Sequence, residues 1–319
     1  MSQEILRLKI VERFEDRGGI LQLKLTEANG GDLPPFEAGS HLDIHVRHGD
    51  IDLWRQYSLC GDPEETNVYR LGILKDPKSR GGSVAIHDLA RPGTRVDANP
   101  PRNHFPLAED AGRSILFGGG IGITPMLAMA HRLHKLGGDF ELHYCTRSKD
   151  VTAFMDKIGD MPFKDRIHFH HDDEKTFFDP AKLPAPNAGT HVYVCGPQGF
   201  MDWLIREAEA AGYSSSHIHR EYFSADVDLT GDSFEVEARV SGITITVGPE
   251  ETIAKALAKV GVEVEVKCEE GVCGTCLTEI LEGIPEHRDM FLTDEEKAEN
   301  IEMTVCCSRA KSKKLVLNI

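Results

Sequence analysis

The chain has 319 residues, more than one hydrophobic core usually organises, so two or three domains are expected. Its formal net charge of −16, from 36 basic and 52 acidic side chains, argues against nucleic acid as a partner, and no apolar run is long enough to predict a membrane span. The first residues lack the apolar core of a secretory signal, which predicts a cytoplasmic location, where the eight cysteines are expected to be ligands, catalytic groups or buried thiols.

Residues 1–105 predict an antiparallel β-barrel, because short alternating apolar runs such as ILQLKLTE and VYRLGIL are broken by Gly, Pro and Asp. Within this region, Arg55-Gln56-Tyr57-Ser58 has side chains suited to a flavin mononucleotide. Arg55 can clamp a phosphate, Tyr57 can lie against the ring or the ribityl chain, and Ser58 can hydrogen-bond a ring nitrogen. Gly81-Gly82-Ser83 precedes a helical pattern whose first N–H groups can hold an anion. A turn followed by a capped helix is the alternative interpretation.

Residues 106–226 predict an α/β domain with a parallel sheet, since strand-like runs alternate with helical patterns after the prolines at 100, 101 and 106. Gly118-Gly119-Gly120-Ile121-Gly122-Ile123-Thr124-Pro125 follows a strand and opens a helix, as pyrophosphate binding requires, although Ile123 occupies the third glycine position of the dinucleotide fingerprint. Cys195-Gly196-Pro197 ends another strand, where Cys195 can contact a nicotinamide. A merely buried thiol is the alternative for Cys195.

A linker is expected at 227–235 and a third domain at 236–319, which carries the strongest chemical signal. Cys268, Cys273 and Cys276 form C-x4-C-x2-C, and Cys306 follows thirty residues later, which is the spacing of a plant-type [2Fe–2S] cluster. Zinc is the alternative, but its motifs usually pair two short knuckles. Cys307 is a rival fourth ligand, although adjacent residues of an extended segment point to opposite sides.

Taken in order, these motifs resemble the phthalate dioxygenase reductase family, which includes vanillate demethylase reductase components. The resemblance implies a ferredoxin-reductase-like flavin barrel, a central nicotinamide domain and a C-terminal α+β ferredoxin domain of the β-grasp type. It also implies FMN as the flavin and NADH as the nucleotide, with Ser58, Cys195 and Phe223 as catalytic residues, the ring of Phe223 covering the isoalloxazine. Gln56 and Leu74 replace residues common in phthalate reductase itself. The cofactor-binding residues expected from the motifs and the resemblance together are Arg55, Gln56, Tyr57, Ser58, Gly72, Ile73, Leu74, Gly81, Gly82, Ser83, Gly119, Gly120, Ile121, Thr124, Pro125, Thr146, Arg147, Cys195, Gly196, Pro197 and Phe223.

These expectations define an NADH-dependent reductase of an oxygenase system, such as those of aromatic catabolism. NADH would give a hydride to FMN, and single electrons would pass through the cluster to a terminal oxygenase of the Rieske type. The acidic surface suits solubility or attraction to a basic patch on that partner, and a monomer is expected. The alternatives are a free-standing flavin reductase or diaphorase with a structural cluster, and a redox-sensing carrier.

Overall fold

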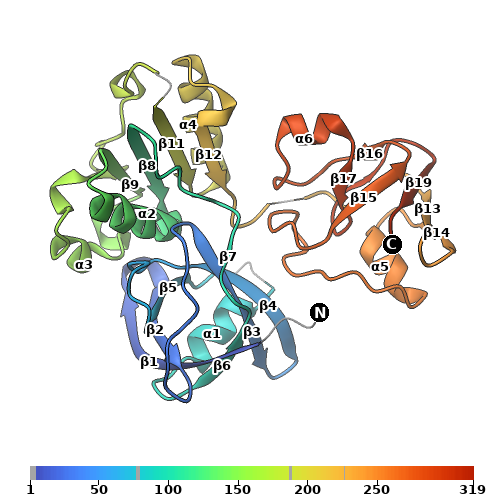
Figure 1. Cartoon of the computed structure of the whole chain (residues 1–319), viewed down its shortest axis with the longest axis horizontal. Coiled ribbons are helices and arrows are strands. Elements are labelled where there is room, and N and C mark those ends of the chain that lie inside the picture. Colours follow the sequence, from blue (N-terminus) through green and yellow to red (C-terminus); the bar gives the residue numbers. More distant parts are fainter. Residues whose placement is uncertain (1–4, 77–79, 187–188, 226) are drawn as a thin grey trace. The chain divides into compact units, whose positions relative to one another are not determined.

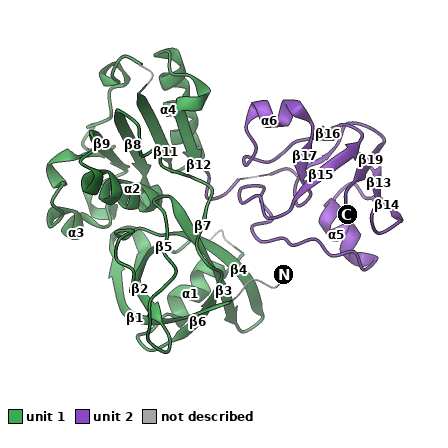
Figure 2. Cartoon of the chain, viewed as in Figure 1, with its two compact units in different colours: residues 1–221 green, residues 222–319 purple. Residues whose placement is uncertain are grey.

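The computed structural model describes residues 5–76, 80–186, 189–225 and 227–319. The chain divides into two compact units, Met1–Glu221 and Tyr222–Ile319 (Figures 1 and 2). No helix among the described residues has both the length and the apolar character needed to cross a membrane. The barrel and the α/β domain both lie in the first unit, and the ferredoxin-like domain forms most of the second.

The barrel is a curved antiparallel sheet with the strand order β4-β3-β6-β1-β2-β5, and β7 pairs with β3. A bridge between Leu59 and Leu71 joins the region after β4 to β5, so the two ends of the sheet approach each other. Alternate residues of β3, such as Leu42, Ile44 and Val46, are buried in the interior, as the alternating pattern predicts. The elements are β1 (Leu6–Asp16), β2 (Ile20–Glu27), β3 (Ser40–His48), β4 (Ile51–Ser58), β5 (Tyr69–Leu74), α1 (Gly82–Leu89), β6 (Arg95–Ala98) and β7 (Arg102–Asn103).

The α/β part of the first unit is a parallel sheet with the strand order β10-β9-β8-β11-β12. The strand order reverses between β8 and β11, and the carboxyl ends of parallel strands at such a point commonly form a ligand crevice. The elements are β8 (Arg113–Gly119), α2 (Ile123–Leu136), β9 (Phe140–Thr146), α3 (Met155–Gly159), β10 (Ile167–His171), β11 (Thr190–Cys195), α4 (Gln198–Ala210) and β12 (Ile218–Glu221).

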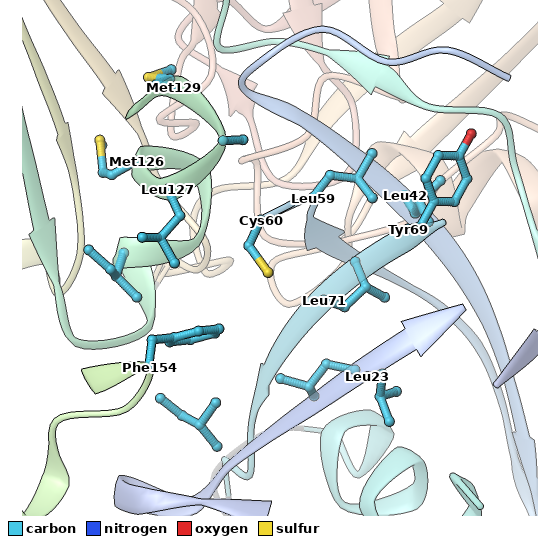
Figure 3. Packing of buried hydrophobic residues seen from close by; sticks show 14 of the residues in the cluster. Leu23, Leu42, Leu59, Cys60, Tyr69, Leu71, Met126, Leu127, Met129 and Phe154 are labelled. Atoms are coloured by element: carbon cyan, nitrogen blue, oxygen red, sulfur yellow. The ribbon is translucent and has the colours of Figure 1, made fainter. Parts of the chain in front are cut away.

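The barrel and the α/β part share one hydrophobic core (Figure 3). Leu127 of α2 and Phe154 point toward barrel residues such as Cys60 and Leu71, and Met126 belongs to the same cluster of buried side chains. A Cβ atom on Gly72 of β5 would come within 2.7 Å of the Phe154 ring, so the barrel can approach this closely only with glycine there. This packing explains why residues 1–221 form one unit. The domain boundaries expected from the sequence stay predictions.

The second unit has the β-grasp arrangement predicted for its ferredoxin domain. Its sheet has the order β14-β13-β19-β15-β17, in which β13 and β19 are parallel, and β16 pairs with β18. The buried side chains of α5 belong to its core, and the antiparallel pair of β13 and β14 turns at Gly242, whose φ is 67°. The elements are β13 (Phe234–Ala238), β14 (Ile243–Val247), α5 (Ile253–Lys259), β15 (Leu277–Glu282), β16 (Pro285–Glu286), α6 (Asp294–Glu299), β17 (Glu302–Thr304), β18 (Arg309–Ala310) and β19 (Lys314–Leu317).

Candidate functional site

The four predicted cysteine ligands converge in the second unit because β15 and β17 are paired. Cys276 immediately precedes β15 and Cys306 follows β17, and the register places Leu277 opposite Thr304. The Cys268 thiol interacts with the thiols of Cys273 and Cys306, and Cys306 also reaches the thiol of Cys276. These hydrogen bonds lower the pKa of Cys268 far below the usual thiol value and raise that of Cys306. The structure therefore brings together all four residues that the spacing predicted.

Glycines allow the loop to fold closely around this thiol cluster. Gly271 and Gly274 have φ angles of 70° and 67°, which residues with a side chain rarely adopt. A Cβ atom on Gly271 would lie 2.5 Å from the sulfur of Cys307. The Glu270 N–H donates to the Cys268 sulfur over 3.4 Å, the kind of contact that stabilises a negatively charged cluster.

The spacing of the thiols along the chain favours two irons over one zinc ion. Zinc requires ligands that converge on one point, whereas a [2Fe–2S] cluster spreads four thiolates over two irons. The Cys307 thiol lies 3.2 Å from the Thr304 hydroxyl and also interacts with the Cys306 thiol.

The predicted phosphate site lies in the first unit, where β4 meets the start of α1. A Cβ atom on Gly82 would come within 2.9 Å of the Arg55 side chain, so the Arg55 side chain passes directly over the first helical residue. Gly81 is the N-cap, with φ of 92°, and presents no side chain to the first turn of the helix. A guanidinium beside a helix N-terminus is a chemically suitable site for a phosphate group.

Tyr57 provides a second observation that suits a bound flavin. Its hydroxyl is buried and has no hydrogen-bond partner within the described parts of the chain. Burial also raises the pKa of Tyr57, so the hydroxyl stays protonated. A buried hydroxyl without a partner is costly, and a polar group of a ligand would satisfy it.

Two other predicted flavin contacts, Gln56 and Ser83, already have hydrogen-bond partners in the protein. The Gln56 amide nitrogen lies 3.0 Å from a ring nitrogen of His41, and the Ser83 hydroxyl hydrogen-bonds the backbone of Asp76. Ile73 is buried in the core, whereas Leu74 is 37% exposed. Contacts of these residues and of Gly72 with a flavin stay predictions.

The glycine-rich motif and the Cys-Gly-Pro motif meet at the edge of the parallel sheet. The pairing of β8 with β11 places Gly118 opposite Cys195, and a Cβ atom on Gly122 would clash with the carbonyl of Cys195. A Cβ atom on Gly196 would lie 2.9 Å from the Cα of Gly119. The N-terminus of α2 opens beside this contact, so the structure brings together at one sheet edge the residues predicted to bind the nucleotide, whose role stays a prediction: Gly119, Gly120, Ile121, Thr124, Pro125, Cys195, Gly196 and Pro197.

Thr146 is the last residue of β9, and Arg147 follows it at the same edge of the sheet. The Thr146 hydroxyl lies 2.7 Å from the Thr152 hydroxyl and 3.0 Å from a ring nitrogen of His171, so protein groups already satisfy it. Arg147 is exposed. A role for either residue in nucleotide binding stays a prediction.

A hydrogen bond between Ser58 and Glu221 joins the barrel to the parallel sheet, and Cys195 is the strand neighbour of Glu221. The Ser58 hydroxyl donates to a Glu221 carboxylate oxygen over 3.4 Å, and β-sheet pairing places Glu221 opposite Cys195. Burial raises the pKa of Glu221 to about 8, although the Ser58 hydrogen bond opposes this shift. Burial also raises the pKa of Cys195 well above that of a free thiol, so Cys195 is a neutral thiol.

Glu221 was not among the residues predicted from the sequence. Its position becomes evident only from the register of β11 and β12, and a charged residue at the end of a short strand was the sole available signal. Phe223 is the second residue of the second unit and is 39% exposed. Contact between Phe223 and the flavin stays a prediction.

Comparison with known proteins assigns the cysteine cluster and the fold. Residues 236–311 match the family model for a 2Fe–2S iron–sulfur cluster binding domain, so this unit carries a [2Fe–2S] cluster rather than zinc, and the assignment of the four thiols as its ligands stays a prediction. The chain is 48% identical to a vanillate O-demethylase oxidoreductase of Pseudomonas sp. strain HR199, over 94% of this chain and 95% of the relative. The structure of phthalate dioxygenase reductase, described as a modular structure for electron transfer from pyridine nucleotides to [2Fe–2S], matches with a TM-score of 0.74. That match has 37% identity and covers 99% of this chain and 98% of the other.

A longer protein contains the same arrangement of domains. An intact type IV self-sufficient cytochrome P450 monooxygenase matches with a TM-score of 0.86 and 36% identity over 99% of this chain. This chain spans only 41% of that longer chain. The three-domain fold expected from the sequence is thus confirmed: a flavin-binding barrel, a parallel-sheet nucleotide domain and a ferredoxin domain.

Proposed function

The chain belongs to the oxygenase reductase family that includes vanillate O-demethylase oxidoreductases and phthalate dioxygenase reductase, and we propose that it transfers electrons from NADH to a terminal oxygenase. FMN is the proposed first acceptor, and the [2Fe–2S] cluster is the exit for single electrons. When bound, FMN accepts a two-electron hydride and releases its electrons one at a time, as a one-electron cluster requires.

The hydrogen bond between Ser58 and Glu221 is the observation that carries this proposal. It joins the end of a barrel strand to the end of a strand in the nucleotide domain, 163 residues later, beside Cys195. A flavin held by the barrel and a nicotinamide held by the sheet edge would therefore meet at one place. The position of these three residues suits hydride transfer between a ligand of the barrel and a ligand of the parallel sheet.

In this proposal, the residues of the phosphate site and those around the Ser58–Glu221 hydrogen bond have separate roles. Arg55 and the first turn of α1 hold the phosphate, and the Tyr57 hydroxyl binds a polar atom of the flavin. Cys195 supplies a neutral, apolar contact for the nicotinamide. Glu221, whose pKa is raised to about 8, can hold a proton at neutral pH and exchange it through the Ser58 hydroxyl.

The partner is proposed to be a Rieske-type oxygenase, and the first one to test is the oxygenase component of a vanillate O-demethylase. The 48% identity to a vanillate O-demethylase oxidoreductase supports this choice. We further propose a cytoplasmic location, since none of the eight cysteines is in a disulfide, as a reducing compartment would preserve them, and a monomer on the family resemblance. NADH is proposed over NADPH on the family resemblance. The exposed Arg147 is the cation that would meet the 2′-phosphate of NADPH, so it is the residue that argues for the other nucleotide.

Three measurements on the purified protein test this function. Flavin released by denaturation should be FMN, and kcat/KM should be higher for NADH than for NADPH. The Cys276→Ser variant should keep NADH-dependent ferricyanide reduction, which needs only the flavin, and lose cytochrome c reduction, which needs the cluster. Release of FAD, or cytochrome c reduction that survives the loss of the cluster, would contradict the proposal.

A further inference from the structure

A buried carboxylate lies beside the cysteine cluster of the second unit. The side chain of Asp289 is 0% exposed. One carboxylate oxygen accepts a hydrogen bond from the Leu292 N–H over 2.8 Å, and the other accepts one from the Ser308 hydroxyl over 3.4 Å. Burial of a charged group is costly, so such a residue usually has a specific role.

The carboxylate of Asp289 has no basic side chain as an ion-pair partner within the described residues, apart from the His287 ring at 3.6 Å. Burial lowers the pKa of His287, and both of its ring nitrogens are buried without a hydrogen-bond partner in the described parts of the chain. His287 is therefore neutral at neutral pH. The nearby Lys297 donates to the backbone carbonyl of Asp289 and not to its carboxylate. The hydrogen bonds that the Asp289 carboxylate accepts thus come from neutral donors, the Leu292 N–H and the Ser308 hydroxyl.

Asp289 contacts both chain segments that supply the cluster ligands. A Cβ atom on Gly271, which lies between Cys268 and Cys273, would come within 2.9 Å of the Asp289 Cα. The Met290 N–H donates to the Gly271 carbonyl over 3.0 Å, which fastens the segment to the loop. On the other side, Ser308 lies two residues after Cys306 and joins the hydroxyl of Thr304 to the Asp289 carboxylate.

A charge in this position acts on the cluster by electrostatics. A [2Fe–2S] cluster with four thiolates becomes more negative by one unit when it is reduced, and a neighbouring buried anion opposes that change. Water and salt screen a buried charge poorly. We propose that the buried carboxylate of Asp289 lowers the reduction potential of the cluster and so keeps the cluster a strong enough reductant for the oxygenase. This inference rests on the proposed function, in which the cluster is the exit for electrons.

The test is a redox titration of the full-length protein with the cluster intact. Asp289→Asn removes the charge but keeps the shape and one oxygen acceptor, and Asp294→Asn removes the same charge from an exposed position at the start of α6. The potential is measured from the electron paramagnetic resonance signal of the chemically reduced cluster, at low and at high salt. Cluster iron and visible absorbance are recorded for each protein, so the readout is independent of NADH turnover.

The proposal predicts that Asp289→Asn assembles the cluster with a more positive potential and that the shift persists at high salt. Asp294→Asn should match the wild type, and Asp289→Glu, which keeps the charge, should lie closer to the wild type than Asp289→Asn does. An unchanged or more negative potential in Asp289→Asn would overturn the proposal. So would loss of cluster iron from Asp289→Asn, because Asp289 would then be only an anchor of the loop. A wild-type protein without a [2Fe–2S] signal would refute the proposed function instead.

Discussion

Replacing Arg309 by lysine should strongly destabilise the second unit. The guanidinium of Arg309, which is 2% exposed, donates to four backbone carbonyls, those of Leu229, Asp232, Gly248 and Glu251, over 2.8–2.9 Å. Its carbon Cζ also lies 5.2 Å from the centre of the Phe234 ring. Arg309 therefore joins the segment before β13 and the turn before α5 to the strand that follows the cluster ligand Cys306.

The size of the effect follows from the number of hydrogen bonds. A lysine ammonium donates from one nitrogen and cannot reach four carbonyls arranged around a planar guanidinium, so about two hydrogen bonds should be lost. Each hydrogen bond from a charged donor contributes roughly 1.5–3 kcal/mol, and some relaxation should reduce the total to about 3 kcal/mol. For a domain of roughly 100 residues this lowers the Tm by about 12–24 °C.

Thermal unfolding at a fixed heating rate measures this change in the second unit when it is followed by the cluster absorbance at wavelengths beyond the flavin band. Arg239→Lys is the matched control, since Arg239 bonds the side chains of Glu237 and Glu282 at the surface. Its Tm should fall by only a few degrees, because exposed ion pairs contribute about 1 kcal/mol or less. Equal changes in the two variants, or a loss below about 4 °C for Arg309→Lys, would refute the reasoning.

Three further predictions concern the first unit. Gly122→Ala should greatly raise the KM for NADH, because the new Cβ clashes with the Cys195 carbonyl. The control is Gly199→Ala, whose Cβ would have no atom within 4 Å and which should leave steady-state kinetics unchanged. Equal KM values for the two variants would exclude the predicted contact. Arg55→Ala should weaken FMN binding by about 10–100-fold, as measured by flavin retained in dialysis, and full retention would remove Arg55 from the phosphate site. Burial lowers the pKa of His219 to about 4, below about 6.5 in the unfolded chain. Its contribution to stability is complete above about pH 6.5 and is lost as the pH falls toward 4, so His219→Phe should flatten the dependence of the unfolding free energy on pH.

The features that the sequence predicted correctly, namely the cluster, the barrel and the parallel sheet, follow from local rules. The spacing of Cys268, Cys273, Cys276 and Cys306 indicates the cluster, because a short loop with a distant fourth thiol is specific to that chemistry. Alternating apolar runs indicated the barrel, and strands alternating with helical patterns indicated the parallel sheet. Both signals are read within a few neighbouring residues.

Other features depend on contacts between distant segments and left no local signal. Glu221 meets Ser58 only through the packing of the barrel on the parallel sheet. Arg309 bonds backbone carbonyls 58 to 80 residues earlier in the chain, and backbone groups are the same for every residue type. Asp289 is buried between two ligand segments that only the pairing of β15 with β17 brings together. The single core shared by barrel and sheet depends likewise on Phe154, which the sequence alone does not connect to the barrel.

An anaerobic titration with NADH tests the central claim most directly. Flavin absorbance and cluster absorbance are followed together, and Cys276→Ser is titrated in parallel. The account predicts that both centres are reduced and that about 1.5 equivalents of NADH suffice, since FMN takes two electrons and the cluster takes one. The variant should need about one equivalent and show only flavin bleaching. If NADH leaves the flavin oxidised, or if the flavin is reduced while the cluster stays oxidised in the presence of excess NADH, the proposed electron path is wrong.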